Sequence, residues 1–353
     1  MEKYDLKTPA GRVWAALYGE DPQSAPFTIY EIFISQSTRE RMLRNSGLCI
    51  VRRVNSYNIK YRGINHRAIH YTENDREMVR TVFDTPYGEL STLKEKAGSS
   101  YWNREFLFKS SDDYKKLNAL ISSMTATQNY DNAVQIIKDC GDDFIIRDNL
   151  PLEPLQHFIS SDIMDMSDFC CEWMDNRDEL LKLYNGFVEF NRSVYKIVAD
   201  GPMRLTNYGG NVIPQVIGRN VFEEYYMPHY EEAVEVIGKA GKLVGCHFDA
   251  DNLPIMDLIA KTPLDYIEAY DPGISPPLSE AIKAFNGKTI WITWPCKWHH
   301  AASSEVEEYT EELLRDADGY NKFIIGVTED IPPSNLLYTL EGIAAGIEKF
   351  YSK

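Results

Sequence analysis

The stretch Leu243-Val244-Gly245-Cys246-His247-Phe248-Asp249-Ala250-Asp251 shows most clearly how this chain of 353 residues is built. Its first half is a short apolar run, which indicates a buried strand, and Asp251-Asn252-Leu253-Pro254 is typical of the start of a helix. A buried strand that leads directly into a helix is the repeating unit of parallel sheets with crossover helices. The stretch therefore predicts an α/β fold with polar side chains just beyond a strand.

The same alternation of a short apolar run with a helical pattern extends over most of the chain. It becomes regular from residue 140 onward, and a β-rich run introduced by Pro26 adds an earlier strand. The expected strands are 27–34, 144–146, 204–206, 243–246, 266–267, 289–293 and 323–326. Because this rhythm is typical of barrels of alternating strands and helices, we expect a (β/α)8 TIM-type barrel as a single domain over residues 1–353.

Residues 48–83 do not follow this rhythm. Segments such as Ile50-Val51-Arg52-Arg53-Val54 and Ile59-Lys60-Tyr61-Arg62 alternate between apolar and polar residues, which indicates hairpin strands. We therefore predict a β-hairpin excursion from the barrel over residues 48–83. The eighth barrel strand is then expected between residues 60 and 130.

The composition is that of an ordinary globular protein, and the charge disfavours several classes of function. Hydrophobic residues make up 44% of the chain and the net charge is −16, which argues against binding to nucleic acid or to an anionic membrane. No apolar run is long enough to span a bilayer, and the six cysteines have no regular spacing. The chain also lacks a phosphate-binding loop and a G-x-S-x-G nucleophile elbow. We therefore expect a cytoplasmic protein that is neither a nucleotide enzyme nor a serine hydrolase.

In a parallel barrel, functional side chains come from the carboxyl ends of the strands and the loops beyond them. These ends supply the candidates Tyr30, Glu31, Arg147, Asp148, Asn207, Tyr208, His247, Asp249, Glu268, Trp294, Cys296 and Glu329. In the densest group, a period of two places His247, Asp249 and Asp251 on one side of an extended chain. Such a group can bind a metal ion, or act as an acid/base pair in which a carboxylate fixes the histidine tautomer. The alternative is a histidine hydrogen-bonded at a strand end, with aspartates that cap the next helix.

A second group, Cys296-Lys297-Trp298-His299-His300, follows the strand that ends near Trp294. A thiolate and two imidazoles are ligands suited to zinc, but a closed structural site needs four ligands. The sequence has no matching CxxC or HxxxH partner. A surface loop with a buried cysteine is the alternative interpretation, and the lack of a partner motif favours it.

Several motifs, taken in order, resemble the uroporphyrinogen decarboxylase-like superfamily, which includes methyltransferases that move methyl groups to and from corrinoid proteins. The resemblance rests on residues 85–90, 109–114, 222–228, 241–251, 265–268 and 326–333. The stretch before Phe27 has nothing similar to the arginine-rich segment with which the decarboxylase itself grips carboxylates. The resemblance therefore implies a methyltransferase rather than a tetrapyrrole decarboxylase.

In the corrinoid-linked methyltransferases, a His-x-Cys pair on one strand and a second Cys at the end of the last strand bind zinc. Matched to this pattern, His247 is retained, Asp249 stands at the position of the first Cys, and Glu329 at that of the second. The resemblance thus implies a zinc ion held by these three residues, with Glu268 as a candidate fourth ligand and Cys296 as the next candidate. This set is richer in oxygen than a thiolate site, which suits a Lewis acid that acts on a methylated oxygen or nitrogen.

The resemblance implies transfer of a methyl group from a small methylated donor, such as an aryl methyl ether or a methylamine, to a separate corrinoid-binding protein. The residues expected to bind the substrate are Tyr30, Arg147, Asn207, Tyr208 and Trp294. One rival is a metal-independent decarboxylase or lyase in which His247 and Asp249 move protons and Arg147 binds a carboxylate. Another is a binding protein without enzyme activity on the same barrel.

Overall fold

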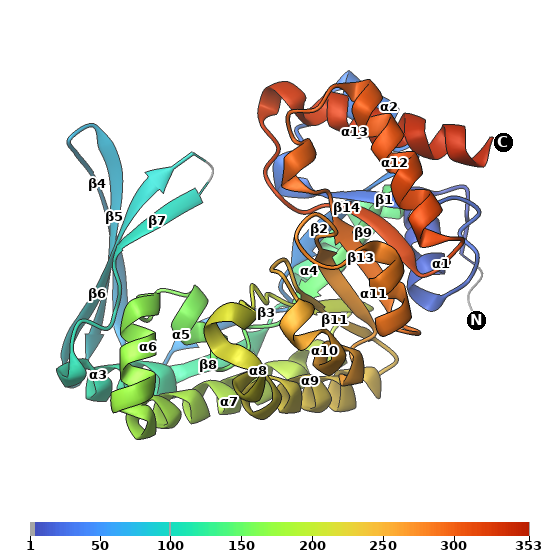
Figure 1. Cartoon of the computed structure of the whole chain (residues 1–353). Coiled ribbons are helices and arrows are strands. Elements are labelled where there is room, and N and C mark those ends of the chain that lie inside the picture. Colours follow the sequence, from blue (N-terminus) through green and yellow to red (C-terminus); the bar gives the residue numbers. More distant parts are fainter. Residues whose placement is uncertain (1–3, 99, 353) are drawn as a thin grey trace. The chain divides into compact units, whose positions relative to one another are not determined.

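The computed structural model describes residues 4–98 and 100–352, and these separate into two compact units. The first unit lies within residues 1–56, 130–150 and 198–353, and the second within 57–129 and 151–197. Figure 1 shows the whole chain with its elements labelled. The expectation of a single domain over the full length stays a prediction.

The first unit contains a closed barrel of eight parallel strands, in the order β1-β14-β13-β12-β11-β10-β9-β2. The strands are β1 (Phe27–Tyr30), β2 (Leu48–Val54), β9 (Phe144–Asn149), β10 (Leu205–Tyr208), β11 (Leu243–His247), β12 (Tyr266–Tyr270), β13 (Thr289–Thr293) and β14 (Phe323–Val327). With helices between the strands this is a TIM barrel, so the predicted fold class is confirmed.

The barrel strand that the sequence did not reveal is β2. We predicted residues 48–83 as a hairpin excursion and placed the eighth strand between residues 60 and 130, and both predictions are wrong for Leu48–Val54. The alternation of apolar and polar residues suggested a hairpin strand, but the first four residues of β2 are buried in the barrel. The antiparallel excursion itself begins only at Tyr57.

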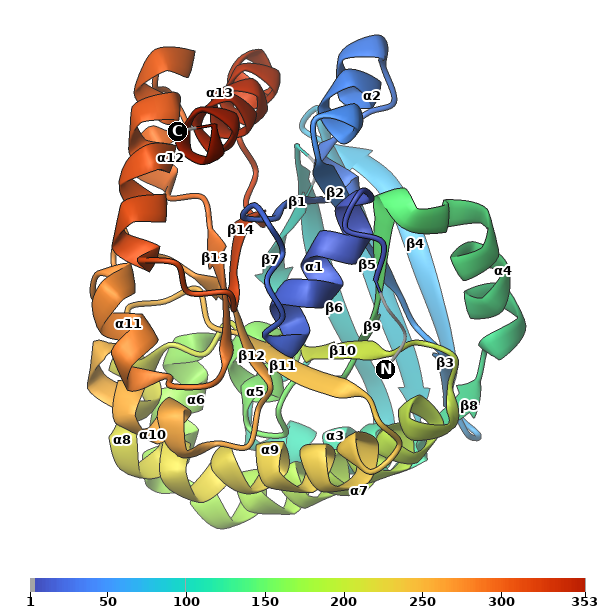
Figure 2. The ribbon, with the colours of Figure 1, turned by 90° about the vertical axis from the view of Figure 1, so that its right-hand side faces the viewer.

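Helices surround the barrel and close one of its ends. In the first unit they are α1 (Pro9–Tyr18), α2 (Thr38–Asn45), α4 (Tyr130–Cys140), α8 (Pro214–Tyr225), α9 (Met227–Ala233), α10 (Met256–Lys261), α11 (Leu278–Ala284), α12 (Ser303–Ala317) and α13 (Pro333–Tyr351). Figure 2 shows α12 and α13 packed together. They approach closely at Gly346, where a Cβ atom would lie 2.6 Å from Cβ of Thr310.

The interior of the barrel is filled in layers. The lower layer is apolar and packs against Ala10, Val13, Ala16 and Leu17 of α1; it consists of Tyr30, Cys49, Val51, Ile145, Leu205, Tyr266, Trp291 and Ile324. Two residues further along four of these strands are Arg53, Arg147, Asn207 and Glu268. Because side chains alternate across a strand, these polar groups also face the interior. The barrel thus carries a polar layer directly above an apolar one, at the carboxyl ends of the strands.

Three lysines fasten the opposite end of the barrel. Lys242, Lys288 and Lys322 each directly precede a barrel strand, and each donates hydrogen bonds to backbone carbonyls. The acceptors are Val198 and Gly201 for Lys242, Thr262 and Leu264 for Lys288, and Gly287 for Lys322. These contacts are favourable because cations are stabilised near the carbonyl ends of helices. They attach the end of each helix, or the segment after it, to the start of the next barrel strand.

The second unit holds the antiparallel excursion. Strands β3 (Tyr57–Tyr61) and β8 (Met124–Gln128) form a pair, and β4 (Asn65–Glu73), β5 (Arg76–Thr85), β6 (Gly88–Ala97) and β7 (Ser100–Glu105) form a four-stranded sheet. Its helices are α3 (Tyr114–Ser123), α5 (Gln156–Ser160), α6 (Met166–Asp175) and most of α7 (Arg177–Asp200). Over the residues that the structure describes, no helix has the length and apolar character needed to cross a membrane.

Candidate metal centre

His247, Asp249 and Glu329 converge at the carboxyl end of the barrel. One ligand atom from each lies within 4.8 Å of the others, and no other such group of three is found among the described residues. His247 ends β11, Asp249 follows it by two residues, and Glu329 follows the end of β14. Nε2 of His247 lies 3.5 Å from Oδ2 of Asp249. The structure therefore brings together the three residues that the sequence placed on two separate strands.

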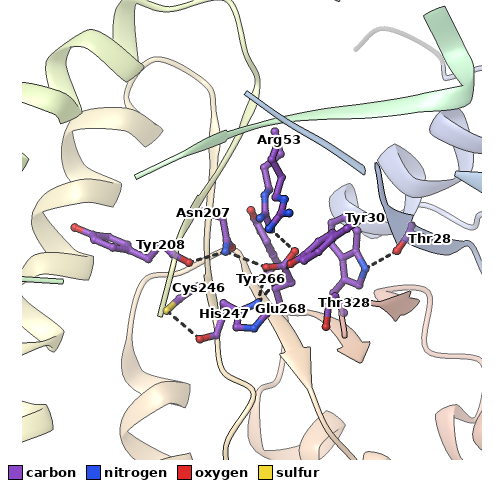
Figure 3. Close-up of polar contacts among 12 residues, drawn as sticks. Thr28, Tyr30, Arg53, Asn207, Tyr208, Cys246, His247, Tyr266, Glu268 and Thr328 are labelled. Carbon is purple, nitrogen blue, oxygen red and sulfur yellow. Dashed lines mark hydrogen bonds and ion pairs between the residues drawn. The ribbon is translucent and has the colours of Figure 1, made fainter. Parts of the chain in front are cut away.

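Glu268 holds the other side of the histidine ring, as Figure 3 shows. Nδ1 of His247 lies 3.2 Å from Oε2 of Glu268, and because a carboxylate only accepts, Nδ1 carries the proton of this bond. The same Oε2 accepts from Nδ2 of Asn207 at 3.0 Å, while Oε1 accepts from Arg147. With Nδ1 engaged, Nε2 is the nitrogen directed at Asp249. A carboxylate behind a ligating histidine is the usual means of fixing its tautomer.

The backbone of His247 is braced by the loop after β10. The carbonyl of His247 accepts from the N–H of Asn211 at 3.3 Å. Gly210 lies against the same carbonyl with φ of 65°, and a Cβ atom at Gly210 would lie 1.9 Å from the carbonyl oxygen. Only glycine combines this left-handed conformation with so close an approach. The end of β11 is therefore fixed before any ligand binds.

The charges of the group act strongly on one another. Burial lowers the pKa of His247, but the hydrogen bonds and charges of Asp249 and Glu268 outweigh burial and raise it to about 9. Burial raises the pKa of Glu268, yet the charge of Arg147 and the contact with His247 hold it well below its usual value. Burial also raises the pKa of Glu329. A divalent ion at this group would take the place of the proton on His247, because metal ligation needs the neutral ring.

Tyr30 lies beside this group, between two arginines. Its hydroxyl lies 3.4 Å from Nδ1 of His247, and the guanidinium carbons of Arg53 and Arg147 lie 4.2 and 5.4 Å from the centre of its ring. Burial is the main cause that raises the pKa of Tyr30. The backbone N–H of Arg53 donates to Oε1 of Glu31 at 3.3 Å. Arg53 was not among the predicted candidates, because the end of β2 was not recognised as a barrel strand end.

Asp271 is a second residue that the sequence reasoning missed. It directly follows β12, its side chain is buried, and its Oδ1 accepts from the N–H of Gly273 at 2.6 Å. Burial raises its pKa, and the charge of Asp249 acts in the same direction. The strand was predicted to end at Ile267, whereas it continues to Tyr270. Reading the strand to its true end would have added Asp271 to the candidates.

Two of the predicted aromatic residues lie on the outer side of the barrel. The ring of Tyr208 packs against Tyr230 of α9, with centres 5.4 Å apart, and Figure 3 shows it pointing away from His247. Trp294 packs edge-on against Tyr309 of α12, also at 5.4 Å. Both side chains fill the space between strands and helices. Neither ring joins the group around His247.

Three further candidates lie outside the metal-binding group. Cys296 is exposed in a short turn after β13, so the cysteine of this loop is not buried as expected. Oδ1 of Asp251 accepts from the N–H of Leu253 at 3.1 Å, which is the helix-start contact of the alternative interpretation. Asp148 accepts from both the backbone and the hydroxyl of Ser56. In the stretch from His247 to Asp251, Asp249 thus belongs to the metal-binding group, whereas Asp251 stabilises the turn that follows.

No protein-family model and no curated protein matches the chain. Among solved structures it is similar to a methyltransferase from Methanosarcina mazei, with a TM-score of 0.59 and 12% identity over 98% of this chain and 99% of that one. The fold is that of a known methyltransferase. A B12-independent methionine synthase from Shewanella sp. W3-18-1 is less similar, with a TM-score of 0.47 and 10% identity over 89% of this chain and 85% of that one. At such identities the likeness to the first structure concerns the fold and not the chemistry.

Proposed function

We propose that this chain is a zinc-dependent methyltransferase of the uroporphyrinogen decarboxylase-like superfamily, which moves a methyl group from a small methylated donor to a corrinoid-binding protein. The observation that carries the proposal is the convergence of His247, Asp249 and Glu329, with His247 held from behind by Glu268. The fold shared with a methyltransferase agrees with it.

The residues present fit a catalytic zinc site. Zinc in enzymes is held by three protein ligands, drawn from histidine, carboxylates and cysteine, with a fourth position left for water or substrate. His247, Asp249 and Glu329 supply one nitrogen and two carboxylates. Both oxygens of Glu268 already accept hydrogen bonds, so we assign it to orienting His247 rather than to the metal. The fourth position is then left to the methyl donor.

A bound zinc ion would act as a Lewis acid on the heteroatom that carries the methyl group. In the proposed transfer, the bond between the methyl carbon and this heteroatom would break, and the heteroatom would keep the electron pair and take up a proton from water. A cobalt(I) corrinoid held by the partner protein would supply both electrons of the new bond to the methyl carbon. Within this chain, Glu268 keeps the proton of His247 on Nδ1. The hydroxyl of Tyr30 lies 3.4 Å from the same nitrogen, with Arg53 and Arg147 beside its ring.

The contacts of Arg147 favour this proposal over a decarboxylase. Arg147 forms a buried ion pair with Glu268 through Nη1, so its charge is already balanced before a substrate carboxylate approaches. Both side chains are almost fully buried. The pair therefore serves to hold Glu268 in place behind His247.

Metal analysis tests the proposal first. Protein purified without chelators should contain about one zinc ion per chain, and His247→Ala should lose it. His300→Ala is the matched control, because His300 is exposed and lies outside the group. If His300→Ala lost zinc while His247→Ala retained it, the ion would instead be bound at the group Cys296-Lys297-Trp298-His299-His300.

Methyl transfer is measured by the absorbance change of a free or protein-bound cobalt(I) corrinoid. A panel of aryl methyl ethers and methylamines supplies the candidate donors. We expect activity with one donor class and a loss of about 100-fold or more in His247→Ala. A protein that transfers methyl groups equally well after its metal has been removed would contradict the proposal.

A further inference from the structure

Strand β4 forms one edge of the four-stranded sheet (Figure 1), and all of its residues are exposed. Within the described chain it pairs with β5 on one side only. Natural proteins protect such edges with proline, with charged side chains and above all lysine, with a bulge or with a short strand. The nine residues of β4 include no proline and no lysine, and the pairing with β5 has no register shift. The two charged residues of β4, Arg67 and Glu73, have opposite signs.

The opposite edge of the same sheet is protected. Strand β7 has six residues, and its pairing with β6 contains a register shift. Residues near Asp162 also cover this edge: Nδ2 of Asn103 donates to Oδ1 of Asp162 at 3.2 Å, and the N–H of Leu107 donates to its carbonyl at 2.9 Å. Of the two edges of this sheet, β4 is therefore the open one.

The turn between β4 and β5 fixes which backbone groups face outward. Asn74 and Asp75 have φ values of 50° and 61°, as in a type I′ turn, so Glu73 and Arg76 close the hairpin as a hydrogen-bonded pair. Alternate residues of β4 then bond to β5. The residues whose N–H and C=O groups point away from the sheet are His66, Ala68, His70 and Thr72.

The side chains on one face of β4 are complementary to a second copy of themselves. Arg67, Ile69, Tyr71 and Glu73 share a face, because side chains alternate along a strand. When two copies of β4 are laid antiparallel with His70 opposite His70, Arg67 meets Glu73 at both ends and Ile69 meets Tyr71 twice. The outward backbone groups of the two strands also meet in this register. Ile69 and Tyr71 are 45% and 37% exposed, so the pairing would cover apolar surface.

We propose that two copies of this chain associate through β4, in an antiparallel pairing centred at His70 that joins the two sheets into one. The contact is isologous, since the same segment is used twice. Arg67 is already held within its own sheet by Asp84 at 2.7 Å and Glu89 at 2.8 Å. Its guanidinium is therefore ordered before Glu73 of the second copy approaches.

Charge exchange at the two ends of the strand tests this pairing. Glu73→Arg creates two pairs of like charges and raises the dissociation constant of the dimer at least about tenfold. Arg67→Glu does the same with the opposite sign. In an equimolar mixture of the two variants, both opposite-charge pairs re-form, so a mixed dimer appears at concentrations where each variant alone is monomeric. Sedimentation velocity of the full chain measures all of these states.

Two further variants separate the pairing from general effects on the sheet. Glu77→Arg makes the same charge change on β5 and leaves the dimer unchanged, because Glu77 lies outside the proposed contact. His70→Pro removes one outward N–H and abolishes the dimer, with circular dichroism to verify that the fold is retained. Arg67→Glu also removes the ion pairs with Asp84 and Glu89 and so can prevent folding. In that case Glu73→Arg and His70→Pro test the pairing. A wild-type monomer at every concentration, or a dimer that Glu73→Arg and Glu77→Arg affect equally, overturns the proposal.

Discussion

Replacement of Glu268 by glutamine exchanges one carboxylate oxygen for an NH2 group at the point where Glu268 meets Arg147, Asn207 and His247. Oε1 accepts from Arg147, and Oε2 accepts from Asn207 and lies 3.2 Å from Nδ1 of His247. The NH2 group donates hydrogen bonds, so in either orientation of the glutamine it would face another donor. That donor is Arg147 in one orientation and Asn207 in the other. Removal of one partner of a buried ion pair costs about 3–5 kcal/mol. We expect Glu268→Gln to lower the free energy of unfolding by about this amount, since both members of the pair are buried.

The same substitution changes the histidine. With the amide group toward Nδ1, the neutral ring accepts a hydrogen bond there and carries its proton on Nε2, the nitrogen that faces Asp249. In that tautomer Nε2 has no lone pair for a metal. Loss of the outer partner of a ligating histidine weakens metal binding about 10–100-fold. We expect the zinc affinity of the variant to fall by at least this factor.

Urea unfolding gives the free energy of unfolding, and competition with a fluorescent chelator gives the zinc affinity. Glu341→Gln is the matched control, because Glu341 pairs with Arg39 at the surface, where an ion pair contributes about 0–1 kcal/mol. A Glu268→Gln protein that unfolds at the same urea concentration as the control and binds zinc as the wild type does would refute the role assigned to Glu268.

Further substitutions probe the support of the site and of the barrel. Gly210→Ala brings a Cβ atom to 1.9 Å from the carbonyl of His247, so it should weaken zinc binding and cost more stability than Gly241→Ala, which has a similar φ but nothing within 4 Å; urea unfolding and chelator competition compare the two. Burial lowers the pKa of Lys288 to about 8 from 10.5. Between these values the unfolded state binds a proton that the folded state does not, so the free energy of unfolding of the wild type should rise with pH over this range, and the rise should be smaller in Lys288→Met. Tyr30→Phe keeps the ring between its arginines and removes only the hydroxyl 3.4 Å from Nδ1, so its zinc affinity should change less than about tenfold in the same competition assay.

The barrel could be predicted from the sequence because strands buried on both faces appear as continuous apolar runs. β13 was predicted with its observed bounds, whereas β12 was predicted too short because Glu268 interrupts its apolar run. β2 was missed for a similar reason, since its arginines led us to predict a hairpin strand, whereas Arg53 belongs to the polar layer of the barrel. Charged residues that face a barrel interior thus carry the same signal in the sequence as residues that face water.

The candidate site was predictable only where it is local. The spacing of His247 and Asp249 was visible within one stretch. Glu329 follows a different strand, so the sequence offered it only as one of many strand-end candidates, and a family resemblance grouped it with these two residues. The direction of Tyr208 depends on the phase of its strand, which cannot be determined without knowing that Asn207 faces inward. Asp271 depends on an irregularity, because the register shifts between Glu268 and Tyr270. These features arise from pairing and not from residue type.

The lysines that fasten the lower end of the barrel provide a chemical reporter of its integrity. Lys242 and Lys288 are buried, and both use their ammonium groups on backbone carbonyls. An acylating reagent, which modifies lysines only when they are accessible and unprotonated, should therefore leave these two unlabelled in the folded chain while it labels exposed lysines such as Lys239. As the barrel unfolds, each strand separates from the helix before it, and the lysine between them becomes accessible. A peptide map would measure the labelling of Lys242 and Lys288 separately. Labelling at the end of the barrel farthest from the metal-binding group would thus report global unfolding of the barrel.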